Sequence, residues 1–458
     1  MEKVRGIIVT FFIIVVWAFP CLKLIAQEEN GKINQVEVVE TEILDEREIS
    51  DQEEGIEEDE IFNEAIFEDK IKESKAQEEK QRLETLIGAD FIFFNSYSQP
   101  VDFNTYYMSS LFYGKVFSKA TYPDIVSLFI SYNFSLPVFQ YTGNVESYTG
   151  YPSSVIYAEL SEIFMSFDIY KKVFFRIGYQ LIAWGPSVFW TPVDFINKNK
   201  VDPLSELDLR TGKPGAKIHF PFKGSNLFLF FDFSQSIGDN NITSSIVDKT
   251  RIGVRFDTIL MGYELGLNSY IGKDLITLWG IDWSGVLLRT DFYGEVAISK
   301  GSNTPKLRLT EPPSTYMLYY PDEIILETSL GFSKSFGEFK YWTLRGEFFF
   351  NSNGYESDAP YSYLIAENLF TPLYMGKLYG YLSLTRSNLF TQNISGTSAL
   401  LINVLDTSFD LYTTLSFNFP NLIPYNIRLS ITGGEDEKEF TFWKGQAVTL
   451  SVYTKVVI

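Results

Sequence analysis

The clearest pattern in the first half of the chain is an alternation of apolar and polar residues. Two alternating runs, Val155–Asp168 and Val173–Trp184, flank the short charged connection Tyr170–Lys172. In the second run apolar side chains occupy one face, whereas Arg176 and Gln180 occupy the other. A period of two residues is that of a β-strand, so this stretch predicts an antiparallel hairpin.

Both runs are about twice as long as a usual globular strand. Such a length suits a hydrocarbon core of about 30 Å that is crossed at a tilt. The strands of a membrane barrel direct apolar side chains towards lipid and polar side chains towards the lumen. We therefore expect an all-β fold, a large antiparallel transmembrane β-barrel.

The same alternation continues from Ala89 to the last residue and predicts a barrel of about 18 strands, within a range of about 16 to 18. The predicted strands are Asp90–Ser98, Tyr106–Phe117, Ile125–Leu136, Val155–Asp168, Val173–Trp184, Gly215–Phe222, Asn226–Ser236, Lys249–Thr258, Leu260–Ile271, Asp274–Ser284, Val286–Ile298, Glu323–Phe336, Lys340–Asn351, Tyr374–Ser387, Ser398–Leu405, Ser408–Phe419, Tyr425–Thr432 and Gln446–Ile458.

The connections between these runs are alternately short and long. Lys223–Ser225 and Pro420–Pro424 are short, whereas Gly185–Pro214, Ser299–Asp322 and Ser352–Leu373 are long. Short periplasmic turns opposite long outer loops are typical of outer-membrane barrels. The final run alternates up to the terminus, which is the form of strand that barrel-assembly machinery recognises. That machinery and the lipid bilayer of the outer membrane are therefore the expected partners.

Strand parity places charged side chains on the face opposite the apolar one. An arginine at mid-depth would cost about 2–4 kcal/mol if it faced lipid, so this face is expected to line the lumen. The candidate lumen-lining and solute-contacting residues are Arg176, Gln180, Arg251, Arg255, Asp257, Glu264, Asp282, Arg289, Asp291, Glu295, Glu327, Arg345 and Glu347. The same parity places Asp232, Glu323, Asp410 and Arg428 on this face.

The mixed signs of these charges have two interpretations. Opposite charges on neighbouring strands can pair and brace the wall. They can also select a polar or amphiphilic solute along a water-filled path. We expect both roles together, with a plugged barrel as the alternative.

The composition agrees with a barrel wall that has one apolar face and one solvated polar face. Aromatic residues make up 17% of the chain, yet the mean hydropathy is only -0.02. The net charge of -20 is uneven, because Glu28–Glu84 alone holds 22 acidic and 7 basic residues, a net of -15. A nucleic-acid partner would need a basic stripe, and the sequence has none.

The N-terminus predicts export. Residues 1–26 combine Lys3 and Arg5, an apolar run and the small residue Ala26, as in a secretory signal peptide. Cys21, the only cysteine, also raises the alternative of lipidation, although Pro20 fits a lipobox poorly. Residues 27–88 then predict an acidic periplasmic tether, disordered or weakly helical, and a helix there would pair with a periplasmic partner or with itself.

Two other functions compete with a channel: an outer-membrane hydrolase and a structural or adhesive barrel. An outer-membrane hydrolase usually needs a histidine base, and the single histidine, His219, has no evident serine nucleophile beside it. No metal-ligand cluster, P-loop or glycine-rich dinucleotide turn occurs, so neither a metal nor a cofactor is expected. A structural or adhesive barrel would instead present Gly185–Pro214 and Ser299–Asp322 at the surface, and these loops could also fold inward as a constriction.

Three fragments resemble a known group. The spacing R-x-G-x-Q-x-x-x-W-G at Arg176–Gly185, the stretch Pro192–Ala216 and the stretch Tyr320–Glu347 are similar to Gram-negative outer-membrane proteins related loosely to alginate-export and porin-type barrels. Tyr179 stands where that group usually has arginine. The resemblance implies a barrel that moves organic solutes or polymers. We expect an outer-membrane channel for polar or amphiphilic solutes, and not an enzyme.

Overall fold

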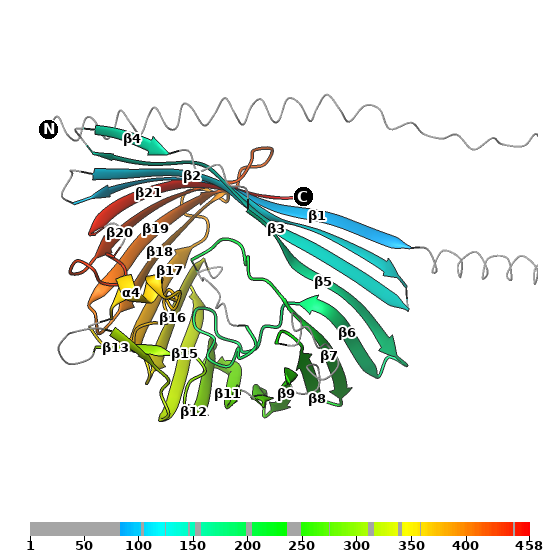
Figure 1. Cartoon of the computed structure of the whole chain (residues 1–458). Coiled ribbons are helices and arrows are strands. Elements are labelled where there is room, and N and C mark those ends of the chain that lie inside the picture. Colours follow the sequence, from blue (N-terminus) through cyan, green and yellow to red (C-terminus); the bar gives the residue numbers. More distant parts are fainter. Residues whose placement is uncertain are drawn as a thin grey trace, which may run out of the picture. The chain divides into compact units, whose positions relative to one another are not determined.

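The chain folds as a closed, antiparallel barrel of eighteen strands (Figure 1). The computed structural model describes residues 83–101, 105–123, 125–144, 147–151, 157–197, 204–235, 249–273, 275–309, 316–337, 341–357, 359–442 and 445–458. The predicted signal peptide and the predicted acidic tether up to residue 82 lie outside these ranges. Among the described residues, no helix has both the length and the apolar character needed to cross a membrane.

Each barrel strand pairs with the next one along the chain, and β1 pairs with β21 to close the sheet from Asp90 opposite Val457 to Pro100 opposite Ala447. The barrel strands are β1 (Glu84–Pro100), β2 (Thr105–Tyr122), β3 (Val126–Asn144), β5 (Tyr157–Ile169), β6 (Val173–Gln180), β7 (Lys213–Phe222), β8 (Ser225–Asp232), β9 (Arg251–Leu260), β10 (Tyr263–Gly272), β11 (Leu275–Leu287), β12 (Thr290–Lys300), β15 (Ile324–Phe336), β16 (Trp342–Asn351), β17 (Leu378–Arg386), β18 (Ile394–Asn403), β19 (Ser408–Phe417), β20 (Tyr425–Gly433) and β21 (Ala447–Val457).

Four further elements lie at one end of the barrel. The short strand β4 (Ser147–Tyr151) pairs with β3. The hairpin of β13 (Lys306–Leu309) and β14 (Tyr316–Tyr319) forms a separate two-stranded sheet. The helix α4 (Tyr361–Ala366) has six residues and lies in the connection between β16 and β17.

The two faces of the wall differ as the alternation predicts. On β11 the outward side chains of Trp279 and Ile281 are 54% and 51% exposed, whereas the inward carboxylate of Asp282 is buried. On β16 Phe348 faces outward, and its neighbours Glu347 and Phe349 are buried inside. The outer face is thus an apolar band, and the interior holds polar groups together with packed aromatic rings.

The two ends of the barrel differ in their connections. At the end that holds the start of β1 and the end of β21, the turn end, no connection exceeds seven residues. The β5–β6 turn has a φ of 54° at both Tyr170 and Lys171, as in the tight turns that match strand twist. At the loop end the connections run up to 32 residues at 181–212. The predicted alternation fails at three loop-end connections, 101–104, 273–274 and 404–407, which are also short.

Several strand boundaries differ from the sequence prediction in the first part of the barrel: β2 ends at Tyr122 instead of Phe117, and β6 ends at Gln180 instead of Trp184. β1 begins at Glu84 instead of Asp90, so residues assigned to the tether belong to the wall. β3 continues past Pro137, which has no N–H for the ladder. A register shift between Ser110 and Leu111 on β2 accommodates it, because the shift leaves one residue of β3 without a partner at this point.

Candidate functional site in the barrel lumen

The connection between β6 and β7 enters the barrel instead of covering its outside, as the green trace inside the strands shows in Figure 1. Its described residues are 181–197 and 204–212. Trp184 and Ile196 pack with inward Phe230 and Tyr270, whereas Trp190 packs with inward residues of β16–β19. Leu207 packs with β1, β2 and β21. We call residues 181–212 the inward segment, and it crosses the lumen from wall to wall.

Two wall carboxylates hold the first half of the inward segment. Glu295 on β12 accepts hydrogen bonds from the backbone N–H of Ser187 at 2.9 Å and of Val193 at 3.1 Å. Both carboxylate oxygens are used, and the side chain is fully buried. Gly185 has a φ of 94°, a region in which a side chain is strained, where the chain turns beside this carboxylate.

Glu347 on β16 holds the next three residues in the same way. Its carboxylate accepts the backbone N–H groups of Val188 at 3.1 Å, Phe189 at 3.0 Å and Trp190 at 2.7 Å. The hydroxyl of Tyr293 donates a fourth hydrogen bond at 3.0 Å. A buried loop otherwise lacks partners for its backbone, and these carboxylates supply them.

The second half of the inward segment is held by side chains of its own. Glu206 accepts hydrogen bonds from Arg428 at 2.8 Å and from the Tyr453 hydroxyl at 2.6 Å. Arg210 donates to Asp194 at 3.0 Å and to Asp208, and this ties the two halves of the segment together. The segment is therefore fixed to the wall on three sides.

The predicted lumen residues fall into three environments. The first group is fully engaged by contacts inside the protein and comprises Gln180, Arg255, Asp282, Glu295 and Glu347. Gln180 Nε2 donates to the backbone oxygens of Arg176 and Gly215, and Arg255 pairs with buried Asp282 at 2.7 Å. Glu295 and Glu347 hold the inward segment. Gln180, predicted as a leading solute contact, is fully buried.

The second group remains inward and accessible. Its members are Arg176, Arg251, Asp257, Glu264, Asp291, Glu327 and Arg345. The third contains Arg289 alone, whose predicted place on a strand is wrong. Arg289 follows Leu288 in the β11–β12 turn, where both residues have positive φ, so the turn falls later than the sequence pattern suggested.

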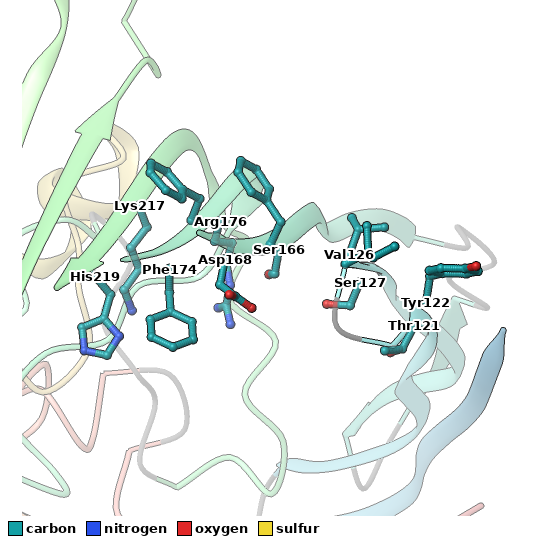
Figure 2. A pocket seen from close by; sticks show the side chains of 13 residues that line it. Thr121, Tyr122, Val126, Ser127, Ser166, Asp168, Phe174, Arg176, Lys217 and His219 are labelled. Carbon is teal, nitrogen blue, oxygen red and sulfur yellow. The ribbon is translucent and has the colours of Figure 1, made fainter. Parts of the chain in front are cut away.

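A hollow lies at each end of the barrel. The one at the loop end has a volume of about 470 Å³ and is lined by the inward segment and by Arg251, Tyr270 and Glu327. The one at the turn end has a volume of about 380 Å³ and is lined by Arg176, Lys217 and His219 among others (Figure 2). The described residues of the inward segment line the first hollow and not the second.

Sequence reasoning missed Lys217 and the inward segment's own charges, Glu206 and Arg210. Lys217 alternates with Ala216 and Ile218 on a predicted strand, so parity alone would have placed it inward beside Arg176. Glu206 and Arg210 lie in an irregular connection, where no period exists to assign a direction.

His219 has the surroundings of a wall residue. Its Nε2 lies 2.9 Å from Asn226 Oδ1, and its ring stacks on Phe228 with centroids 4.3 Å apart. In the described part of the chain, no group of three or more histidine, cysteine or acidic residues is placed to bind a metal ion. The ring nitrogen Nε2 of His219 is therefore engaged by the amide oxygen of Asn226, and the ring forms part of an aromatic stack on the wall.

The fold of this chain is similar to that of several solved structures, although the sequences are only distantly alike. No family model matches the chain, and no curated protein matches it. Among solved structures, OccAB1 of Acinetobacter baumannii is 11% identical, with a TM-score of 0.50 over 82% of this chain and 96% of that one. OccK2 (OpdF) of Pseudomonas aeruginosa, solved in complex with glucuronate, is 10% identical, with a TM-score of 0.50 over 82% of this chain and 98% of that one.

These neighbours are outer-membrane porins and not enzymes. At such low identity the likeness bears on architecture, and it agrees with the closed barrel described above. The comparisons give no support to the relation with alginate-export barrels that the sequence fragments indicated.

Proposed function

We propose that the chain is an outer-membrane channel that passes small polar or amphiphilic organic solutes through a charged lumen. The observation that carries the proposal is the interior itself: a closed barrel with charged groups on its inner face and a fixed segment across it. Export by the predicted signal peptide at residues 1–26 agrees with this location, as does the likeness to outer-membrane porins.

The inward segment favours small solutes over polymers. It crosses the lumen between two hollows of about 470 Å³ and 380 Å³, a size suited to single small molecules. OccK2 holds glucuronate, a solute of that class. We assign the loop end to the outside of the cell and the turn end to the periplasm, because short periplasmic turns and long outer loops are the usual arrangement.

Conductance of the purified barrel in a planar bilayer tests the proposal. We expect steady single-channel current, and swelling of proteoliposomes in small polar solutes but not in polysaccharides of the same osmolarity. A folded barrel that carries no current and admits no solute would overturn it.

A surface role without an open pore is the second candidate. At the loop end, Tyr355, Tyr361 and Leu364 form a packed cluster with Leu307. The adjoining hairpin β13–β14 exposes Met317 and Leu318. A silent but folded barrel that binds surfaces through this layer would favour adhesion.

A further inference from the structure

We propose that the turn-end hollow is a binding site for an organic anion with a flat apolar body, in which Arg176 and Lys217 bind a singly charged oxyanion. This inference deepens the proposed channel function by naming a solute class. It concerns binding, however, which can be measured whether or not the barrel conducts.

Two positively charged side chains, Arg176 and Lys217, lie side by side in the wall of the hollow. Arg176 on β6 lies directly opposite Lys217 on β7, and both side chains face inward. Like charges opposite each other on neighbouring strands destabilise a sheet. In the part of the chain that the structure describes, neither cation makes an ion pair, whereas nearby Arg255 is neutralised by Asp257 and Asp282. A retained pair of unneutralised cations fits a site whose anion comes from outside.

Aromatic rings position both cations. The Arg176 guanidinium lies 4.3 Å from the centroid of the Phe164 ring, and Lys217 Nζ lies 4.9 Å from that of Phe228. Ring faces attract cations without neutralising them, so both charges are oriented and still available. Phe174 and His219, with centroids 5.6 Å apart, add apolar surface to the same hollow (Figure 2).

The polar lining sets the charge of the ligand. Asp168 also lines the hollow and accepts the backbone N–H of Lys171 at 2.7 Å. Glu162, a second acid on β5 whose charge reaches Arg176, is engaged by Lys115 at 3.3 Å and by the N–H of Leu181. Among the residues that line the hollow, Arg176 and Lys217 against Asp168 leave one formal positive charge. A monoanion such as an aryl carboxylate or sulfonate balances it, and Ser127 and Ser166 offer hydroxyls.

Fluorine NMR of small probes with the full-length barrel in detergent tests the site. The probes are 4-fluorobenzoate, 4-fluorobenzenesulfonate, neutral 4-fluorobenzyl alcohol and the non-aromatic anion trifluoroacetate. We expect the fluorine resonances of the two aryl anions to broaden in a saturable way with the wild-type barrel. The alcohol lacks the negative charge and trifluoroacetate lacks the aromatic ring, so both should bind about tenfold or more weakly.

Two variants locate the binding. Lys217→Gln should weaken aryl-anion binding about tenfold or more, and Lys217→Arg should restore most of it. Arg345→Gln is the matched control, since it removes one inward cation near the turn end on β16, away from the hollow. Heat-modifiable gel mobility verifies that each variant is folded.

The outcomes separate this proposal from the channel function. Equal binding by wild type and Lys217→Gln, or equal broadening by empty micelles, overturns the site. Binding of one aryl anion alone identifies carboxylate or sulfonate as the group recognised. Binding that depends on Lys217 in a barrel without current upholds the site and overturns the channel.

Discussion

The indole-bearing residue Trp190 donates its backbone N–H to the carboxylate of Glu347, 157 residues further along the chain, at 2.7 Å. Trp190 also donates its ring Nε1–H to the backbone oxygen of Leu373 at 2.7 Å, and its ring stacks on Phe349. One residue of the inward segment is therefore bound both to the wall and to a loop-end connection. The path through the lumen depends on this contact.

Removal of the Glu347 carboxylate should release the inward segment. In Glu347→Ala the buried N–H groups of Val188, Phe189 and Trp190 lose their acceptor, and each buried orphan donor costs about 1–3 kcal/mol. We expect a lower melting temperature and a larger, noisier single-channel current. Glu347→Gln keeps one acceptor oxygen and should have a smaller effect.

Glu264→Ala is the control for that change. Glu264 is an exposed inward carboxylate at the turn end of β10, and no backbone N–H in the described residues of the inward segment contacts it. Its removal should leave both stability and current noise unchanged. Equal effects of the two substitutions would show that Glu347 does not hold the segment.

A disulfide should form between the inward segment and the wall in the double variant Ser187→Cys, Ser329→Cys. The two hydroxyl oxygens lie 2.7 Å apart, which places these side chains within the reach of a disulfide. We expect a mobility shift on a non-reducing gel after mild oxidation. Ser187→Cys with Ser333→Cys should stay reduced, because Ser333 lies four residues, about 13 Å, further along β15. Cross-linking of both pairs alike would contradict the fixed position of Ser187.

The sequence pattern predicts the wall well and the lumen poorly, for a physical reason. Alternation is a local signal, so it placed Glu295 and Glu347 on the inner face and gave the count of eighteen strands. Their partners are backbone N–H groups of residues 187–193, more than one hundred positions away and without any period. Nothing local encodes that contact, and the choice between an outer loop and an inward constriction stayed open.

Departures from the usual residue preferences of turns and strands explain two further errors. Leu288 and Arg289 form a two-residue turn although neither is glycine or asparagine, the residues that usually mark such turns. The pattern therefore continued a strand through Arg289. In the same way, Pro137 indicated the end of a strand that continues past a bulge.

Protonation of Glu439 should govern the stability of the loop-end connections that this side chain holds together. Glu439, between β20 and β21, accepts the N–H of Leu373, the Tyr379 hydroxyl and Asn403 Nδ2. Burial raises the pKa of this carboxyl to about 7, above the usual value of 4.5. The folded state then binds more protons than the unfolded state between these values, so stability is highest below about pH 4.5 and falls as pH rises towards 7.

Limited proteolysis of the loop end at pH 5 and pH 8 measures this effect. We expect faster cleavage at pH 8 in the wild type, and a much smaller difference in Glu439→Gln, which cannot ionise. Asp406, which accepts the backbone N–H of Glu439, is present in both proteins, so any effect of Asp406 on cleavage is common to the two. A pH difference of the same size in Glu439→Gln would assign the effect to another group.

Single cysteines should report three environments around the wall, since the native chain has only Cys21, within the predicted signal peptide. In proteoliposomes, cysteines at outward Ile177 and Leu330 should resist aqueous maleimide, because lipid covers them. Cysteines at the exposed inward positions Glu264 and Asp291 should react.

A cysteine at Ser329 distinguishes an open lumen from one occupied by the inward segment. Ser329 faces inward but is fully buried beneath Ser187, so its cysteine should be unreactive despite facing the lumen. Adding Glu295→Ala removes the acceptor of the Ser187 N–H and should restore labelling. Rapid labelling of Ser329→Cys in the otherwise native barrel would mean that the segment does not lie against β15. The lumen would then be wider than these contacts imply.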